Sequence, residues 1–152
     1  MGPRHGTNAE RVLSWLKHIH VREDIESVLQ ERCMNGEYLP GLGHSVYGGP
    51  DPRGEFLLDM LMQSGLDHPL IELIPPLLER SHELFGKHMN VDFPLALLVQ
   101  ILNLPKNLQG FCFVFQELAA GLRRHSNNTN CKNKYDLVLH MLVFVGPKEP
   151  FR

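Results

Sequence analysis

The spacing of the apolar residues constrains the fold of this chain more than any other feature of its sequence. These residues recur three and four positions apart far more often than two apart, which is typical of helices with one buried face rather than of half-buried strands. The pattern predicts helices over 8–18, 21–34, 51–65, 68–87, 92–103 and 108–124. We therefore expect an all-α protein.

Particular residues mark several of these helix boundaries. Asp51 followed by Pro52 is typical of an N-cap and a first helical position. Asp92 is also well placed to cap a helix. Pro75 and Pro76 lie inside the fourth segment, where the missing N–H groups and the ring clashes predict a kink or a break.

A loop is expected between the second and third helices. Six of the twelve residues 39–50 are glycine or proline, which favours turns over regular structure. A short hairpin around Val46 and Tyr47 is the alternative, because both residues favour an extended backbone. From Ser126 the sequence becomes polar and then irregular, so we expect a helical domain over 1–126 and a divergent, frayed tail over 127–152.

Composition and charge exclude several classes of protein. A chain of 152 residues with 43% hydrophobic and 21% charged residues is ordinary for a soluble globular domain. The net charge of −2 offers no electrostatic attraction to nucleic acid or to an anionic membrane. No apolar run approaches the roughly 20 residues that a membrane-spanning helix needs, and the first residues show no secretory or transit segment.

The cysteines and histidines suggest neither disulfides nor a metal site. Cys33, Cys112 and Cys131 are odd in number and far apart, which favours free thiols in a reducing compartment, either the cytoplasm or the mitochondrial matrix. The nine histidines include no pair at the spacing of a zinc-binding helix. We therefore expect no bound metal.

Three strings in order along the chain resemble the signatures of the citrate synthase family. They are G-P-R-H-G-T-N-A-E at 2–10, G-L-G-H-S-V-Y-G-G-P-D-P-R at 41–53 and N-V-D-F at 90–93. The likeness extends from residue 2 to about residue 126. It implies an acyltransferase of the tricarboxylic acid cycle, which condenses an acyl-CoA with oxaloacetate and water.

The resemblance also implies a role for individual residues. Asp92 would remove a proton from the methyl carbon beside the thioester, and His5 would donate a hydrogen bond or a proton to the thioester carbonyl. His44 would polarise the ketone of oxaloacetate. Arg53 would hold a substrate carboxylate with its planar fork.

The matching loop of the family binds coenzyme A. By resemblance, Pro40, Gly41, Leu42 and Gly43 would approach its adenine or phosphates, so that acetyl-CoA or propionyl-CoA is a co-substrate and no cofactor is permanently bound. The residues taken alone have plainer interpretations. The Gly41–Gly43 pair would be an ordinary turn, Asp92 a helix cap and His44 a surface residue. Arg53 would lie in a first helical turn, where the helix dipole disfavours a cation, so it needs a partner anion.

The chain departs from the family in ways that leave a second function open. Family enzymes carry a large helical domain before the string at 2–10, so the implied fold is the small helical domain plus one further helix, with the large domain mostly absent. Leu118 stands where the family has a substrate-binding arginine, and no similar arginine follows Ser126. The alternative is therefore a non-catalytic helical fragment or binding module of this family. Either form is expected to work as a homodimer or together with a large domain.

Overall fold

The fold, in a computed structural model, is all-α over the residues that the structure describes. These are residues 3–103, with side chains from residue 8 onward. The helices are α1 (Pro3–Leu16), α2 (Arg22–Met34), α3 (Pro52–Met62), α4 (Pro69–Phe85) and α5 (Asp92–Ile101). The expected all-α class is confirmed, while the helix expected over 108–124 and the tail over 127–152 lie outside the described residues.

Local signals set the helix boundaries. The side chain of Asp51 accepts a hydrogen bond from the backbone N–H of Arg53, so the predicted cap of α3 is confirmed. α4 ends at Phe85 and is followed by Gly86, whose φ of 62° is the left-handed conformation typical of a residue after a helix. Of the kink or break predicted in α4, the break is wrong because the helix continues through both prolines. Ile74 and Leu77 on either side of them are buried, and this packing holds the helix together.

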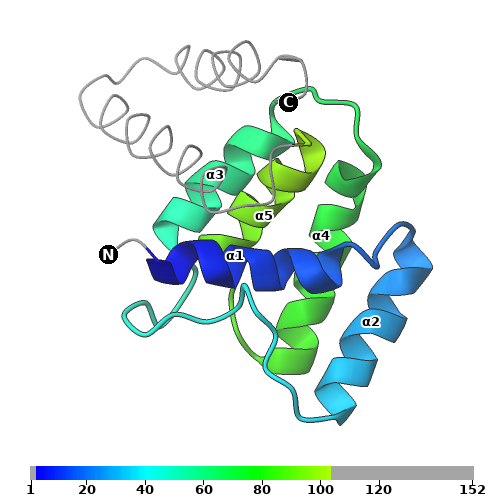
Figure 1. The fold of residues 1–152 in the computed structure, drawn as a ribbon, viewed down its shortest axis with the longest axis vertical. Helices are drawn as coiled ribbons and strands as arrows, with labels where there is room; N and C mark the ends of the chain where they lie inside the picture. Colours follow the sequence, from blue (N-terminus) through cyan, green and yellow to red (C-terminus); the bar gives the residue numbers. More distant parts are fainter. Residues whose placement is uncertain (1–2, 104–152) are drawn as a thin grey trace.

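α5 lies at the centre of the domain. Its first eight residues are all buried, and α1 and α3 pack against it (Figure 1). Trp15 of α1 stacks on Phe93 of α5 with ring centroids 6.1 Å apart. α2 packs on α4 instead. A helix that is apolar on all sides must be surrounded by other elements, so the residues at the start of α5 are held from several directions.

Backbone hydrogen bonds tie the predicted loop 39–50 to the segment between α4 and α5. Gly43 N–H donates to the carbonyl of His88 (2.7 Å), and Asn90 N–H donates to that of Gly41 (2.8 Å). Leu42 and Met89 form the isolated antiparallel bridge between these two bonds. The loop thus pairs with a distant segment, and no strand forms within it in the described structure.

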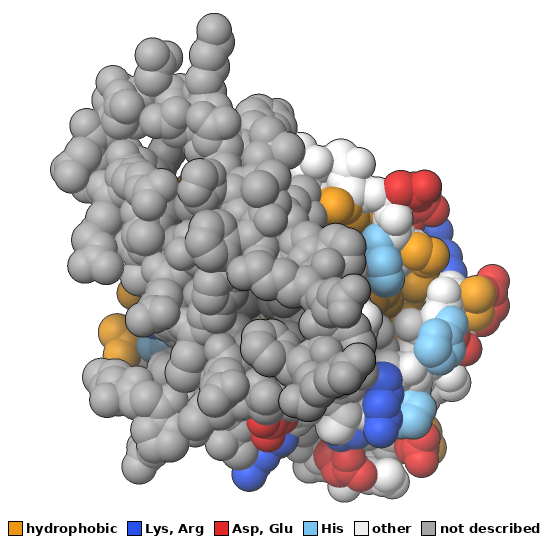
Figure 2. All heavy atoms as spheres, turned by 45° about the horizontal axis from the view of Figure 1, so that its top comes forward, with side chains coloured by type: hydrophobic (Ala, Val, Ile, Leu, Met, Phe, Trp, Pro, Cys, Tyr) orange, Lys and Arg blue, Asp and Glu red, His pale blue; other side chains and the backbone are white. Residues whose placement is uncertain are grey.

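The described surface carries both signs of charge. Figure 2 shows acidic, basic and histidine side chains interspersed with apolar ones on the visible described face. Among residues 3–103, no helix has the length and apolar character required to cross a membrane.

Candidate functional site

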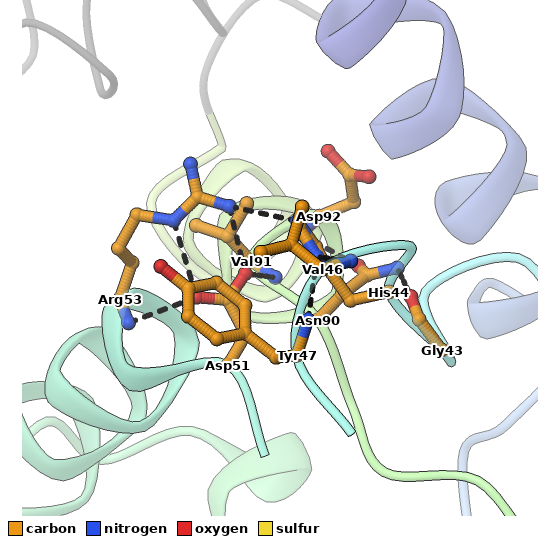
Figure 3. A network of polar contacts seen from close by, with 9 residues as sticks. All are labelled: Gly43, His44, Val46, Tyr47, Asp51, Arg53, Asn90, Val91 and Asp92. Carbon is orange, nitrogen blue, oxygen red and sulfur yellow. Dashed lines mark hydrogen bonds and ion pairs between the residues drawn. The ribbon is translucent and has the colours of Figure 1, made fainter. Parts of the chain in front are cut away.

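A fully buried carboxylate organises the candidate site. Asp51 has no exposed surface, and its Oδ1 accepts hydrogen bonds from the backbone N–H (3.0 Å) and Nε (3.1 Å) of Arg53. Its Oδ2 accepts from Nη2 of Arg53 (2.9 Å) and from the backbone N–H of Val91 (3.3 Å) (Figure 3). Burial alone would raise the pKa of Asp51, but these hydrogen bonds outweigh it and lower that pKa below its ordinary value.

The carboxylate of Asp51 also explains why Arg53 can occupy the first turn of α3. The guanidinium needs a partner anion there, and the Asp51 carboxylate grips it through Nε and Nη2. The hydrogen bonds that Arg53 donates to Asp51 raise the pKa of Arg53, and the negative charge of Asp92 adds to this effect. Arg53 is therefore a fixed cation within the electrostatic reach of Asp92.

His44 lies against the same guanidinium. Its Nδ1 faces the backbone N–H groups of Val46 (3.0 Å) and Tyr47 (3.3 Å), while its Nε2 lies 3.3 Å from Nη2 of Arg53. A neutral imidazole accepts hydrogen bonds at one nitrogen only. Since Nδ1 meets two backbone donors, we assign the proton to Nε2. Nε2–H of His44 and the Nη2 hydrogens of Arg53 then form two adjacent donors, which an oxygen acceptor between them would satisfy.

Asp92 is the first residue of α5 and is only 4% exposed. The predicted capping role is wrong, because Val91 precedes the helix and no side chain caps it; instead, the N–H of Asp92 donates to Oδ1 of Asn90 (3.0 Å). Figure 3 shows the Asp92 carboxylate turned away from the dashed bonds of the network. A carboxylate in a first helical turn is stabilised in its charged form by the helix dipole.

The charge of Asp92 also affects the pKa of Tyr38. Burial and the negative charge of Asp92 both raise the pKa of Tyr38, against a smaller opposite effect of Arg11. The hydroxyl of Tyr38 donates to the carbonyl of Leu42 (3.1 Å). The Asp92 carboxylate therefore lies within electrostatic reach of both Tyr38 and Arg53.

A cavity of about 460 Å³ opens beside His44. Leu42, Gly43, Tyr38 and Lys87 are among its lining residues, with Nζ of Lys87 5.7 Å from the Tyr38 ring centre. Of the four residues expected at a coenzyme A site, only Leu42 and Gly43 line this cavity. Pro40 and Gly41 are instead directed into the fold, as the next contacts show.

The carbonyl of Pro40 accepts a hydrogen bond from the indole of Trp15 (3.2 Å). Gly41 adopts a φ of +93°, and a Cβ there would lie 2.9 Å from Cγ2 of Val12 and 3.2 Å from Cβ of Phe93. The first half of the expected loop is thus anchored in the core, and its second half faces the cavity.

His5 is placed by its backbone alone. It lies in the first turns of α1, which packs on α5, but its side chain lies outside the described set. The structure thus brings His44, Arg53 and Asp92 to one region and leaves the role of His5 a prediction. No group of three His, Cys, Asp or Glu side chains that could hold a metal occurs among the described residues.

Sequence reasoning missed two residues of the site, Asp51 and Asn90. Asp51 was expected only as a helix cap, although the need of Arg53 for a partner anion pointed to a carboxylate two positions away. Asn90 is buried, and its amide donates to the carbonyl of Gly43 (2.8 Å) while its Oδ1 holds Asp92. Asn90 opens the N-V-D-F string at 90–93, but the string does not reveal which groups this asparagine would contact.

Comparison with known proteins identifies the family. A family model described as the C-terminal domain of citrate synthase matches residues 1–127. The 2-methylcitrate synthase, mitochondrial, of Emericella nidulans is 30% identical over 113 residues, which cover 64% of this chain and 25% of that protein. The citrate synthase of Synechocystis sp. is 31% identical over 127 residues, covering 80% of this chain and 32% of that protein.

A further relative is the citrate synthase, peroxisomal, of Dictyostelium discoideum, which is 30% identical over 115 residues. The match covers 70% of this chain and 23% of that protein. The chain therefore spans between 23% and 32% of the length of these three relatives. Because the family model matches most of its length, the chain belongs to the citrate synthase family.

Proposed function

We propose that this chain supplies the His44–Arg53–Asp92 part of an active site that condenses an acyl-CoA with oxaloacetate and water. The products would be citrate, or 2-methylcitrate from propionyl-CoA, together with free CoA. The observation that carries the proposal is the 3.3 Å approach of His44 Nε2 to Arg53 Nη2, within electrostatic reach of Asp92. With the proton of His44 assigned to Nε2, both groups would be donors. A keto acid presents the oxygen acceptors that this pair requires.

Asp92 would act as the base. It would take a proton from the carbon beside the thioester, and the electron pair of that C–H bond would form the enolate. The thioester oxygen needs a hydrogen-bond donor at this stage, and His5 is proposed for that role. The enolate carbon would then form a bond to the ketone carbon of oxaloacetate, and water would later cleave the thioester to release CoA.

His44 and Arg53 would activate the ketone. Nε2–H of His44 would donate to the ketone oxygen, where negative charge develops as the new carbon–carbon bond forms. Arg53 would hold an adjacent carboxylate with the edge of its guanidinium that Asp51 leaves uncovered. Because Asp51 already fixes the guanidinium, this clamp is formed before the substrate arrives.

The cavity beside Leu42 and Gly43 is the proposed site of the CoA moiety. The ammonium of Lys87 lies at its edge and would favour the phosphate groups. Acetyl-CoA and propionyl-CoA both fit the proposal, because the relatives include a citrate synthase and a 2-methylcitrate synthase. The two acyl groups differ by one methylene, which a binding pocket discriminates by only about 1–3 kcal/mol. We propose that the protein is located in a reducing compartment. We also propose that it functions as a homodimer or together with a large domain.

An assay of CoA release tests this function. The purified chain would be incubated with oxaloacetate and acetyl-CoA or propionyl-CoA, both alone and mixed with the part of the Synechocystis citrate synthase that precedes the matched region. Thioester loss should fall by about 10²- to 10⁴-fold in Asp92→Asn, while Asp59→Asn, on the exposed face of α3, should leave it unchanged. Release that does not depend on Asp92 would reject the proposal.

A non-catalytic binding module is the second candidate, favoured by Leu118 at the position of a family arginine. Isothermal titration calorimetry separates the two. Binding of CoA without binding of oxaloacetate supports the module. Binding of both supports the enzyme.

A further inference from the structure

We propose that Asp51 is a positioning residue, whose single carboxylate fixes both the guanidinium of Arg53 and the peptide that leads into Asp92. The inference rests on the proposed function, since it concerns how the substrate clamp and the base of that site are held. Asp51 accepts four hydrogen bonds, two at each oxygen. These occupy the roughly four acceptor positions of a carboxylate, so Asp51 has none left for a substrate.

The first consequence concerns Arg53. A free arginine side chain samples many rotamers, so fixing it costs conformational entropy. Asp51 holds Nε and Nη2 on one edge of the guanidinium, which leaves Nη1 without an acceptor among the described residues. The same contact brings Nη2 to 3.3 Å from Nε2 of His44. Without the Asp51 carboxylate, Arg53 would turn toward solvent and the paired donors would separate.

The second consequence concerns the segment before Asp92. Val91 N–H donates to Oδ2 of Asp51, across a separation of 40 positions in the sequence. Close packing supports this bond, because a Cβ on Gly54 would lie only 3.1 Å from the carbonyl oxygen of Asn90. Asn90 in turn accepts the N–H of Asp92. The start of α3 is thus fastened to the peptide immediately preceding the proposed base.

The two consequences distinguish this role from that of a simple helix cap. Asparagine caps helices as well as aspartate does, so Asp51→Asn retains an acceptor for the backbone N–H of Arg53. Its amide NH₂ would replace Oδ2, however, and would face Nη2 of Arg53 and the N–H of Val91, which are both donors. A cap would tolerate this exchange, whereas a positioning residue would not.

The test compares the full chain with Asp51→Asn and with Glu55→Gln, which removes an exposed carboxylate one turn further along α3. Circular dichroism would check that all three are folded. Calorimetry would give the dissociation constant of oxaloacetate. NMR at varying pH would follow the Arg53 Nε–H and Val91 N–H signals, which report the two bonds directly.

In the unmodified chain, the chemical shifts of both NMR signals should change with pH at the same midpoint, that of the Asp51 carboxyl. In Asp51→Asn, both signals should move and should no longer show this pH dependence. The dissociation constant of oxaloacetate should rise by roughly 10- to 100-fold. This is the usual loss when a residue that only orients a binding group is removed, as measured in metal sites. Glu55→Gln should match the unmodified chain in every measurement. Different titration midpoints for the two signals in the unmodified chain would overturn the inference, even if Asp51→Asn does not fold.

The two proposals fail in different ways. If the unmodified chain binds no oxaloacetate, the proposed function fails, and the NMR signals still decide whether Asp51 holds both groups. If it binds oxaloacetate and Asp51→Asn binds it equally well, the positioning role fails and the proposed function stands.

Discussion

Nη2 of Arg53 lies 3.3 Å from Nε2 of His44, and the backbone donors at Nδ1 assign a proton to that Nε2. Two donors at this distance repel one another slightly unless an acceptor joins them. The ketone and carboxylate oxygens of the proposed substrate would supply such acceptors.

The tautomer of His44 is the first testable point. We expect the neutral ring to carry its proton on Nε2, because Val46 and Tyr47 both present N–H groups to Nδ1. Long-range ¹H–¹⁵N correlation spectra of the imidazole distinguish the two tautomers. A proton found on Nδ1 would contradict the assignment and, with it, the proposed donation to a ketone.

Arg53→Lys should weaken oxaloacetate binding although the positive charge is kept. A lysine has no planar fork and cannot hold Asp51 through two nitrogens while it also reaches a ligand. We expect the dissociation constant to rise by about 10-fold, or about 1.4 kcal/mol, in isothermal titration. Arg22→Lys, an exposed substitution at the start of α2, is the matched control and should change nothing. Equal loss in both variants would point to a general charge effect.

The stability of the domain should depend on pH through Asp51. Its pKa is lowered in the folded state, so its contribution is complete above the unfolded value of about 4 and is lost as the pH falls through the lowered folded pKa. Urea unfolding from about pH 6 to pH 3 should show a smaller decrease in Asp51→Asn than in the unmodified chain. Parallel curves for the two proteins would show that Asp51 is not the group responsible.

Gly41→Ala should destabilise the fold more than Gly36→Ala. Both glycines have positive φ, but a Cβ at Gly41 would collide with Val12 and Phe93, while none lies within 4 Å at Gly36. We expect a loss of about 2–5 kcal/mol in the free energy of unfolding at Gly41, from strain plus overpacking. The loss at Gly36 should be about 1–2 kcal/mol, from strain alone. Chemical denaturation measures both, and similar losses would refute the close approach.

Local sequence predicted the helices well and the site only in part. The cap at Asp51 and the loop 39–50 follow from interactions between near neighbours, which a sequence displays directly. The continuation of α4 through its prolines depends on burial of that helix, which local rules omit. The bonds from Asn90 to Gly43 and from Val91 to Asp51 join positions 47 and 40 apart, so only the folded chain reveals them.

The hydrogen bonds drawn in Figure 3 involve no side chain of α2 or α4. Those two helices are joined to each other by packing and by the pair of Arg80 with Glu26. We therefore expect labels, immobilisation tags or solubility-enhancing substitutions on their outward faces to leave these hydrogen bonds unchanged. An engineer who wants to improve handling of this domain should begin there.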